Sequence, residues 1–417
     1  MEQKLHTPEG VRDIYNRECE TKLTLQQKLS TVLHLYGYQD IQTPTFEYDD
    51  VLRKEIGSTS TKELYRFFDR EGNILALRPD ITPSVARAAA TLFEGEDLPI
   101  RLCYIGNTFI NHSSYQGRLK ENTQMGAELI GLDSVEADAE MIAMVVDGLK
   151  KTGLTEFQVN IGHIDFIQSL LESTGLEEEE KEEIRELITN RNYFGVEEIL
   201  DNRSVKGSVK DAFRILPELV GGQEVLERAA RIAPSANARL ALTRLQQIYR
   251  LLMIYKAEDH VTFDLSMMGS YGYYTGIIFR AYTYGTGDAV VRGGRYDHLL
   301  EKFGKSTPSI GFAIIVDELM SALSRQKISV ETSHRNLLVY TEETQRWAIF
   351  LARDFRDKGK NIEMIKRDQE DRREKYEKYG KRNGIISMLY LRDDFKIEMV
   401  NLRTGEEKII DAKKRRR

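Results

Sequence analysis

The sequence predicts an α+β protein in which helices flank an antiparallel sheet, with a helical insertion in mid-chain and a small α/β domain after it. Strand-like segments lie on both sides of residues 163–255, and short turns, such as the one with Gly285 and Gly287, join the later strands. Short turns connect antiparallel strands, whereas parallel neighbours need a helix between them. Residues 163–255 are instead rich in Glu and Leu at helical spacing, which predicts an all-helical insertion.

The first part of the chain alternates between helix and strand signals. Apolar residues at helical spacing predict a helix over residues 17–37, with Gly37 after its last turn. The segment YGYQDIQTPTFEYDDVL is expected to form a strand into Pro44 and then a second element, because the residue before a proline avoids the helical conformation. Another helix is expected to start with Thr82 as its N-cap and Pro83 as its first residue.

Most strands are expected where apolar residues alternate or run together. Before the insertion these segments are IRLCYIGNTFI, TQMGAELIGL and EFQVNIGH, and a helix capped by Ser134 and ended by Gly153 precedes the last of them. After the insertion they are VTFDLSMM, GYYTGIIFRAYTY, DAVVRGGRYD and SIGFAIIVDELMSAL. The pair Gly293-Gly294 does not predict a phosphate loop, because the third glycine and the strand-to-helix setting are missing.

The pattern changes near residue 325, so we expect two domains. The first covers residues 1–325 and contains the helical insertion at about 165–255; the second covers residues 326–417. The second domain shows a strand, a helix over 341–358, a strand, a helix over 370–382, a strand and a hairpin that turns at Thr404-Gly405. This order predicts a small α/β domain.

Composition indicates an ordinary water-soluble protein of 417 residues, 41% hydrophobic and 30% charged. No apolar run approaches the roughly 18 residues that span a membrane, and the first residues have no apolar core of the signal-peptide kind. The two cysteines, Cys19 and Cys103, have no metal-binding spacing. We therefore expect a cytoplasmic protein without a metal or cofactor.

Charge is distributed unevenly along the chain. The formal net charge is −6, but residues 325–417 carry +8 and the rest of the chain −14. An acidic body is a poor platform for nucleic acid, so we do not expect tRNA binding there. The basic end, including KKRRR at 413–417, has two interpretations. It could contact RNA, or it could be a solvated terminus, which is the simpler interpretation.

Five segments, in order, resemble class II aminoacyl-tRNA synthetases, and among them histidyl-tRNA synthetase. YGYQDIQTPTFE is similar to the first motif of that class, a dimer-interface helix and strand, and ALRPDITPSVAR is similar to its amino-acid loop. GYYTG and GGRYD resemble two stretches particular to the histidine enzyme, and SIGFAIIVDEL stands where the third motif belongs. The resemblance covers residues 5–325 well and 335–410 moderately, the latter being similar to a truncated anticodon-binding domain.

The departures from that family concern its cations. The second motif normally reads Phe-Arg-x-Glu, and here its arginine and glutamate fall at Ile110 and His112. Two further arginines of the family fall at Gly269 and Glu318. Because one positioned arginine is worth roughly 10³–10⁵ in phosphoryl-transfer rate, we expect no adenylation, no aminoacylation and no catalytic residues. His112 has no nucleophile near it in the sequence and is expected to lie on the surface of a loop.

The amino-acid pocket, in contrast, is retained. The resemblance implies a histidine site, and the residues that match it can supply acceptors for an α-ammonium group, a carboxylate for an imidazole N–H, and aromatic rings: Asp80, Thr82, Gln124, Glu128, Tyr273, Tyr274 and Tyr296. Arg118 is the candidate for the ligand carboxylate, although a backbone N–H is an alternative. Tyrosines are also common packing residues, so each tyrosine alone indicates core as readily as pocket.

A synthetase fold that lacks nucleotide cations but keeps a histidine pocket resembles a known paralogue family, the regulatory subunits of ATP phosphoribosyltransferase. The resemblance implies that the chain activates a short catalytic subunit in the first step of histidine biosynthesis and takes part in feedback inhibition by histidine. It also implies a homodimer, formed near Pro44, inside a hetero-octamer of four plus four chains. Two alternatives stay open: an RNA-binding or histidine-sensing paralogue, and an active histidyl-tRNA synthetase.

Overall fold

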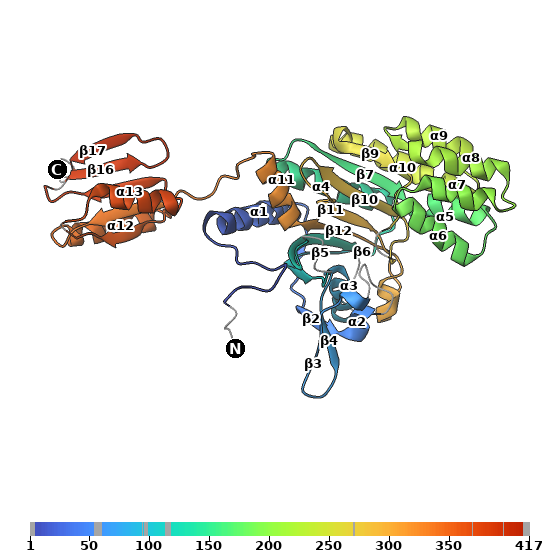
Figure 1. Ribbon diagram of the computed structural model, residues 1–417, viewed down its shortest axis with the longest axis horizontal. Helices are drawn as coiled ribbons and strands as arrows, with labels where there is room; N and C mark the ends of the chain where they lie inside the picture. The colour runs from blue at the N-terminus through green and yellow to red at the C-terminus, as the bar shows by residue number, and fades with distance from the viewer. Residues whose placement is uncertain are drawn as a thin grey trace. The chain divides into compact units, whose positions relative to one another are not determined.

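The computed structural model describes residues 5–53, 61–93, 95, 99–112, 118–269, 272–368, 370–394 and 396–411 (Figure 1). The chain divides into two compact units. The larger consists of Met1–Arg12 and Leu25–Ser329, and the smaller of Asp13–Thr24 and Val330–Arg417. The basic stretch at 413–417 lies outside the described residues.

A nine-stranded sheet forms the centre of the larger unit, in the order β1-β5-β6-β12-β11-β10-β7-β9-β8. Its members are β1 (Gln39–Asp40), β5 (Ile100–Phe109), β6 (Glu121–Ile130), β7 (Phe157–His163), β8 (Val220–Gly221), β9 (Val261–Asp264), β10 (Ile277–Thr283), β11 (Val291–Arg295) and β12 (Ser309–Ile315). Most neighbours are antiparallel, as predicted, but β1 pairs with β5 and β7 with β9 in parallel. The α+β fold class predicted from the sequence is confirmed.

Helices cover both faces of this sheet. On one face, α4 (Val135–Thr152) and α11 (Val316–Arg325) pack against β12 and β6, and α1 (Asn16–Leu35) lies on the same side (Figure 1). The Ser134 hydroxyl caps α4 by accepting from the Ala137 N–H at 3.2 Å, and Gly153 ends it in the left-handed conformation. On the opposite face, α3 (Thr82–Leu92) packs an alanine-rich side on β5.

The predicted N-cap of α3 is wrong by one residue, and the difference has a chemical reason. Thr82 is the first helical residue, and Ile81, whose side chain cannot form a capping hydrogen bond, precedes it as the cap. The Thr82 hydroxyl donates instead to Glu128 of β6 at 2.7 Å. The buried carboxyl group of Glu128 is a stronger hydrogen-bond partner for this hydroxyl than the unpaired N–H groups at the helix end. The tertiary hydrogen bond therefore overrides the local capping signal.

A separate three-stranded sheet, in the order β2-β4-β3, stands beside the amino-acid loop. It consists of β2 (Phe46–Tyr48), β4 (Ile74–Leu77) and β3 (Arg66–Phe68), with α2 (Asp49–Arg53) and the short helix η1 (Thr61–Glu63) around it. Several of its large apolar side chains are exposed, including Phe46, Tyr48 and Phe68.

The insertion between β7 and β9 is helical, as the sequence predicts. Its elements are α5 (Ile164–Ser173), α6 (Glu178–Thr189), α7 (Tyr193–Asp201), α8 (Gly207–Ile215), η2 (Leu216–Glu218), α9 (Glu224–Ile232), α10 (Ala236–Tyr255) and η3 (Glu258–His260). The exception is β8, two residues that pair with β9 at the edge of the main sheet. Among the described residues no helix is long and apolar enough to cross a membrane.

The smaller unit contains a five-stranded sheet in the order β14-β13-β15-β16-β17. Its elements are β13 (Asn336–Tyr340), α12 (Gln345–Asp357), β14 (Glu363–Lys366), α13 (Arg373–Arg382), β15 (Ser387–Leu391), β16 (Lys396–Asn401) and β17 (Glu407–Asp411). The two helices begin three to four residues later than predicted, at Gln345 and Arg373. The Thr341 N–H bonds the Thr344 hydroxyl at 2.9 Å in a turn that delays the first of them.

Candidate functional site

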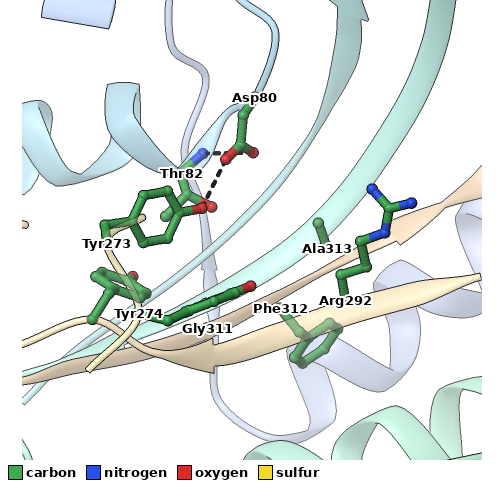
Figure 2. Close-up of a pocket in the computed structure, with 9 residues that line it drawn as sticks. Asp80, Thr82, Tyr273, Tyr274, Arg292, Gly311, Phe312 and Ala313 are labelled. Atoms are coloured by element: carbon green, nitrogen blue, oxygen red, sulfur yellow. Dashed lines mark hydrogen bonds between the residues drawn. The ribbon is translucent and has the colours of Figure 1, made fainter. Parts of the chain in front are cut away.

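A small pocket lies above the main sheet, where the amino-acid loop, the stretch before β10 and the strands β11 and β12 meet (Figure 2). Its side chains leave about 10 Å³ of room, roughly that of one water molecule, and it is lined by Asp80, Thr82, Tyr273, Tyr274, Arg292, Tyr296, Gly311, Phe312 and Ala313. Five of these nine residues were predicted from the sequence as site residues.

Glu128 lies directly behind this lining and is completely buried. One carboxylate oxygen accepts from the Thr82 hydroxyl at 2.7 Å, and the other accepts from the Tyr296 hydroxyl. Gly311 stands opposite Glu128 in the β6–β12 pairing, and a Cβ there would come within 1.6 Å of the carboxylate. Glycine is therefore required at 311 for the carboxylate to occupy this place.

Burial raises the pKa of Glu128 to about 8, although hydrogen bonds from Tyr296 and Thr82 oppose the shift. The Glu128 carboxyl group therefore holds its proton for the most part near neutral pH in the ligand-free pocket. Such a group can accept an N–H from a ligand and can also give a proton to a basic ligand. Imidazole has both properties.

Asp80 is the second buried carboxylate of the pocket. The Tyr273 hydroxyl donates to it at 2.9 Å and the Thr82 backbone N–H at 3.4 Å (Figure 2). Burial raises the pKa of Asp80, while the hydrogen bond from Tyr273 and the positive charge of Arg292 act in the opposite direction. Asp80 is therefore placed to accept from a cationic group in the pocket.

Three tyrosines form the aromatic wall, as the sequence predicts for a ring-binding site. The ring of Tyr273 packs edge-on against the rings of Tyr274 and Tyr296, with distances of 5.1 and 5.8 Å between ring centroids. Tyr273 and Tyr296 are buried and belong to the core cluster that includes α3, whereas Tyr274 is half-buried. Packing and pocket lining are combined here, so the two interpretations of these tyrosines do not exclude each other.

The other two predicted residues do not line the pocket. Gln124 lies on the same strand face as Glu128, four residues along β6, and its side-chain oxygen is buried without a hydrogen-bond partner. Such an orphan acceptor is costly and is typical of a site that receives a ligand or water. Arg118 is exposed, and its charge helps to lower the pKa of Asp288, which is itself ion-paired with Arg292.

Arg292 is a lining residue that the sequence analysis missed. It lies on β11 opposite Ala313 of β12, across the pocket from Tyr273 and Tyr274 in Figure 2. The strand period of two could have revealed it, because residues 292, 294 and 296 alternate onto one face and Tyr296 was already assigned to the pocket.

At the positions where the synthetase has cations, this chain has Ile110, Gly269 and Glu318. Ile110 is half-buried, and His112, expected on the surface, is also half-buried because its ring lies 3.5 Å from the carboxylate of Glu63. Asp317, next to Glu318 at the start of α11, accepts from the Thr123 N–H at 2.7 Å. Acidic groups therefore replace cations near the ends of β6 and β12, which disfavours a triphosphate.

Two arginines within the motif stretches ALRPDITPSVAR and GGRYD are structural. Arg78 donates to the backbone carbonyls of Thr43, Pro44 and Asn107 at 2.9–3.1 Å and so ties the amino-acid loop to two neighbouring segments. Arg295 is buried and pairs with the fully buried Asp138 at 2.6 Å. The donors of Arg295, and the Nε and Nη1 donors of Arg78, are used inside the fold.

Comparison with known proteins agrees with this geometry. A sequence profile described as histidyl-tRNA synthetase matches residues 10–319. Two curated proteins named "ATP phosphoribosyltransferase regulatory subunit" are similar over almost their whole length. The relative from Acetivibrio thermocellus is 39% identical and covers 97% of both chains. The relative from Ruminiclostridium cellulolyticum is 35% identical and covers 96% of both chains.

Solved structures extend the comparison to three dimensions. A Bacillus halodurans structure titled "ATP phosphoribosyltransferase regulatory subunit/histidyl-tRNA synthetase" has a TM-score of 0.83 at 29% identity and covers 94% of this chain and 99% of that one. A histidyl-tRNA synthetase from Nostoc has a TM-score of 0.82 at 19% identity, with both chains fully covered, and shows the shared fold alone. The chain belongs to the family of ATP phosphoribosyltransferase regulatory subunits, built on the histidyl-tRNA synthetase fold.

Proposed function

We propose that this chain activates a short ATP phosphoribosyltransferase catalytic subunit, in the first step of histidine biosynthesis, and carries the site through which histidine inhibits the complex. The observation that carries the proposal is the contrast within one fold. The buried acceptors and rings of an amino-acid pocket are assembled, while the cations of a nucleotide site are replaced by Ile110, Gly269 and Glu318. This contrast suits a sensor without adenylation chemistry.

The pocket matches the chemistry of histidine group by group. In the proposed complex the imidazole N–H donates to Glu128, the α-ammonium group donates to Asp80, and Tyr273, Tyr274 and Tyr296 contact the ring. Gln124 supplies a further acceptor through its unpartnered oxygen. Thr82 holds the Glu128 carboxylate in place at 2.7 Å.

The α-carboxylate needs a cation, and Arg292 is better placed than Arg118. The pairing register puts Arg292 two strands and two residues away from Glu128, roughly 12 Å between Cα atoms, which leaves room for an amino acid between the two side chains. In the ligand-free pocket Arg292 is paired with Asp288, whose side chain is 46% exposed. A ligand carboxylate would replace this partner, while Arg118 assists through its charge from outside.

Inhibition then follows from a shift between conformations. Histidine can regulate the assembly only by the difference in its affinity for active and inhibited states, typically about 1–3 kcal/mol. The pocket has little free space between its side chains, so a ligand of amino-acid size must move part of the lining. Because the lining residues belong to the amino-acid loop and to strands of the main sheet, their movement on ligand binding would shift these elements as well.

The assembly is proposed to be a hetero-octamer of four plus four chains with homodimers inside it. Within each chain, residues 1–325 are proposed as the core domain and residues 326–417 as the small domain. The exposed apolar face of the three-stranded sheet directly after Pro44, with Phe46 and Tyr48 on it, supports a homodimer contact in that region. The acidic remainder of the core is proposed to dock the catalytic chains.

Calorimetry with two ligands tests the histidine site. We expect the wild type to bind histidine and to bind histamine, which lacks the carboxylate, about 10–100-fold more weakly, the value of one charge-assisted pair. Glu128→Ala should abolish histidine binding because it removes the imidazole partner. In Arg292→Gln the preference for histidine over histamine should collapse, whereas Arg118→Gln should keep most of it.

These variants test the location of the histidine pocket and the identity of its carboxylate partner separately. Unchanged histidine binding by Glu128→Ala would contradict the pocket assignment as a whole. Loss of the histidine preference in Arg118→Gln, with Arg292→Gln behaving as the wild type, would return the carboxylate to Arg118 and leave the pocket in place.

A further inference from the structure

A second hollow lies in the smaller unit, at one end of its five-stranded sheet. It has about 370 Å³ of room and opens to solvent. Arg367 directly follows β14, and Tyr390 lies near the end of β15. The complete lining consists of charged residues and one tyrosine: Arg367, Tyr390, Arg392, Asp393, Asp394 and Glu398.

The order of the strands explains why a hollow forms at this end. The strands β14, β13 and β15 are parallel neighbours in this spatial order, although β13 comes first in the chain. The chain passes from β13 to β14 through α12 and from β14 to β15 through α13, and the two helices pack on opposite faces of the sheet. Where such connections diverge, a crevice opens outside the carboxyl ends of the strands, and open α/β sheets bind ligands there.

Arg367 is the residue of this hollow that the fold alone does not explain. Its side chain is only 11% exposed, and its Cζ atom lies 4.9 Å from the centre of the Tyr390 ring. Among the described residues its guanidinium group has no hydrogen-bond acceptor. The Nε atom is buried without a partner, and Oδ1 of Asp393 is 3.9 Å from Nη2, beyond hydrogen-bonding distance. A mostly buried group with unused N–H donors is costly and is typical of a site that receives a ligand.

An arginine with a purely structural role would use its donors inside the fold. Two neighbouring arginines do so, because Arg373 and Arg392 each donate to one carboxylate oxygen of Glu398 at 3.0 Å. The contact with the Tyr390 ring holds the Arg367 group in place by its face. It leaves the N–H edge of Arg367 for a ligand.

The charges beside Arg367 decide which ligand fits. A guanidinium group binds the two oxygens of a carboxylate or phosphate group through parallel N–H bonds. Asp393 lies next to it with a side chain 58% exposed, and its Oδ1 atom accepts from the Thr341 hydroxyl at 2.8 Å. The Asp393 carboxylate repels a phosphate group, which carries more negative charge than a carboxylate, and attracts an ammonium group. The same repulsion disfavours a nucleic-acid backbone at this hollow.

We propose that the hollow of the smaller unit binds a free α-amino acid, with the ligand carboxylate on Arg367 and the ligand ammonium group on Asp393. The two protein side chains approach to 3.9 Å. The carboxylate and ammonium groups of an α-amino acid are attached to the same carbon atom, so one ligand reaches both. The remaining room accommodates its side chain. The proposal does not depend on the histidine pocket, with which the hollow shares no residue.

Saturation-transfer NMR of the full-length chain with each common L-amino acid in turn, followed by titration of those that bind, tests the proposal. We expect saturable binding of at least one amino acid to the wild type and its loss in Arg367→Gln. Arg367→Lys keeps the charge but not the planar fork, so it should restore only part of the binding. Arg403→Gln, at an exposed position between β16 and β17, is the matched control and should bind like the wild type.

Two comparisons test the ammonium partner. The acid that lacks only the amino group should bind about tenfold more weakly or less, and Asp393→Asn, which keeps an acceptor for Thr341, should weaken the amino acid by a similar factor. Circular dichroism shows whether each variant is folded, and Asp393→Asn decides if Arg367→Gln is not. Absence of saturable binding to the wild type would overturn the proposal. Binding that survives in a folded Arg367→Gln chain, or that is unchanged in Asp393→Asn, would do the same.

Discussion

Glu128→Gln should alter the pH dependence of stability more than any other single change in the pocket. Glu128 is fully buried, and its pKa is raised from the ordinary value of 4.5 to about 8. Between these values the folded chain holds a proton that the unfolded chain has released. The stabilising effect of that proton is complete below about pH 4.5 and is lost as the pH rises through about 8.

The size of the effect follows from the shift. A difference of about 3.5 in pKa corresponds to about 5 kcal/mol of unfolding free energy, as an upper estimate for this buried group. Glutamine resembles the neutral carboxyl group and does not titrate. The variant should therefore equal the wild type at acidic pH and become more stable than it toward about pH 9, by several kcal/mol.

Urea unfolding of both proteins, followed by far-ultraviolet circular dichroism across this pH range, measures the difference. Subtracting the two curves removes the other titrating groups that the proteins share. Glu179→Gln, at an exposed position in α6, controls for the loss of one negative charge. A difference between Glu128→Gln and the wild type that stays flat from acidic to alkaline pH would refute the argument.

Three further predictions follow from other parts of the structure. Arg295→Met should destabilise the fold by about 3–5 kcal/mol in urea unfolding, because it leaves the buried Asp138 carboxylate without this partner; a cost below 1 kcal/mol would contradict the buried network. Tyr48→Glu, on the same exposed face of the three-stranded sheet as Phe46, should shift sedimentation toward the monomer, whereas Phe194→Glu, an exposed apolar residue of α7, should not. The wild type should not retard tRNA in gels at physiological salt, and retention that weakens steeply with added salt would revive an RNA-binding role.

The sequence predicts the fold better than it predicts details of the site. Periodicity, turns and caps identify most elements, and the Ser134 cap and Gly153 end of α4 are found where expected. Local signals fail where tertiary chemistry competes with them. The Thr82 hydroxyl bonds Glu128 rather than capping α3, since a buried carboxylate offers a stronger partner than the helix end.

The residues of the candidate site likewise fall into those that the sequence predicts and those that it does not. The five lining residues identified from the sequence lie on motif stretches, where resemblance to a known site assigns each position. Arg292 has no such counterpart, and only the register of β11 against β12 brings it to the pocket.

The measurement that tests the central claim most directly is turnover of ATP and phosphoribosyl pyrophosphate by the short catalytic subunit of the same organism. It should be made with this chain absent, present, and present together with histidine. We predict activity that appears on mixing and falls when histidine is added, with the Glu128→Ala variant activating but resisting histidine. Full activity of the catalytic subunit alone, with no complex formed on mixing, would contradict the account.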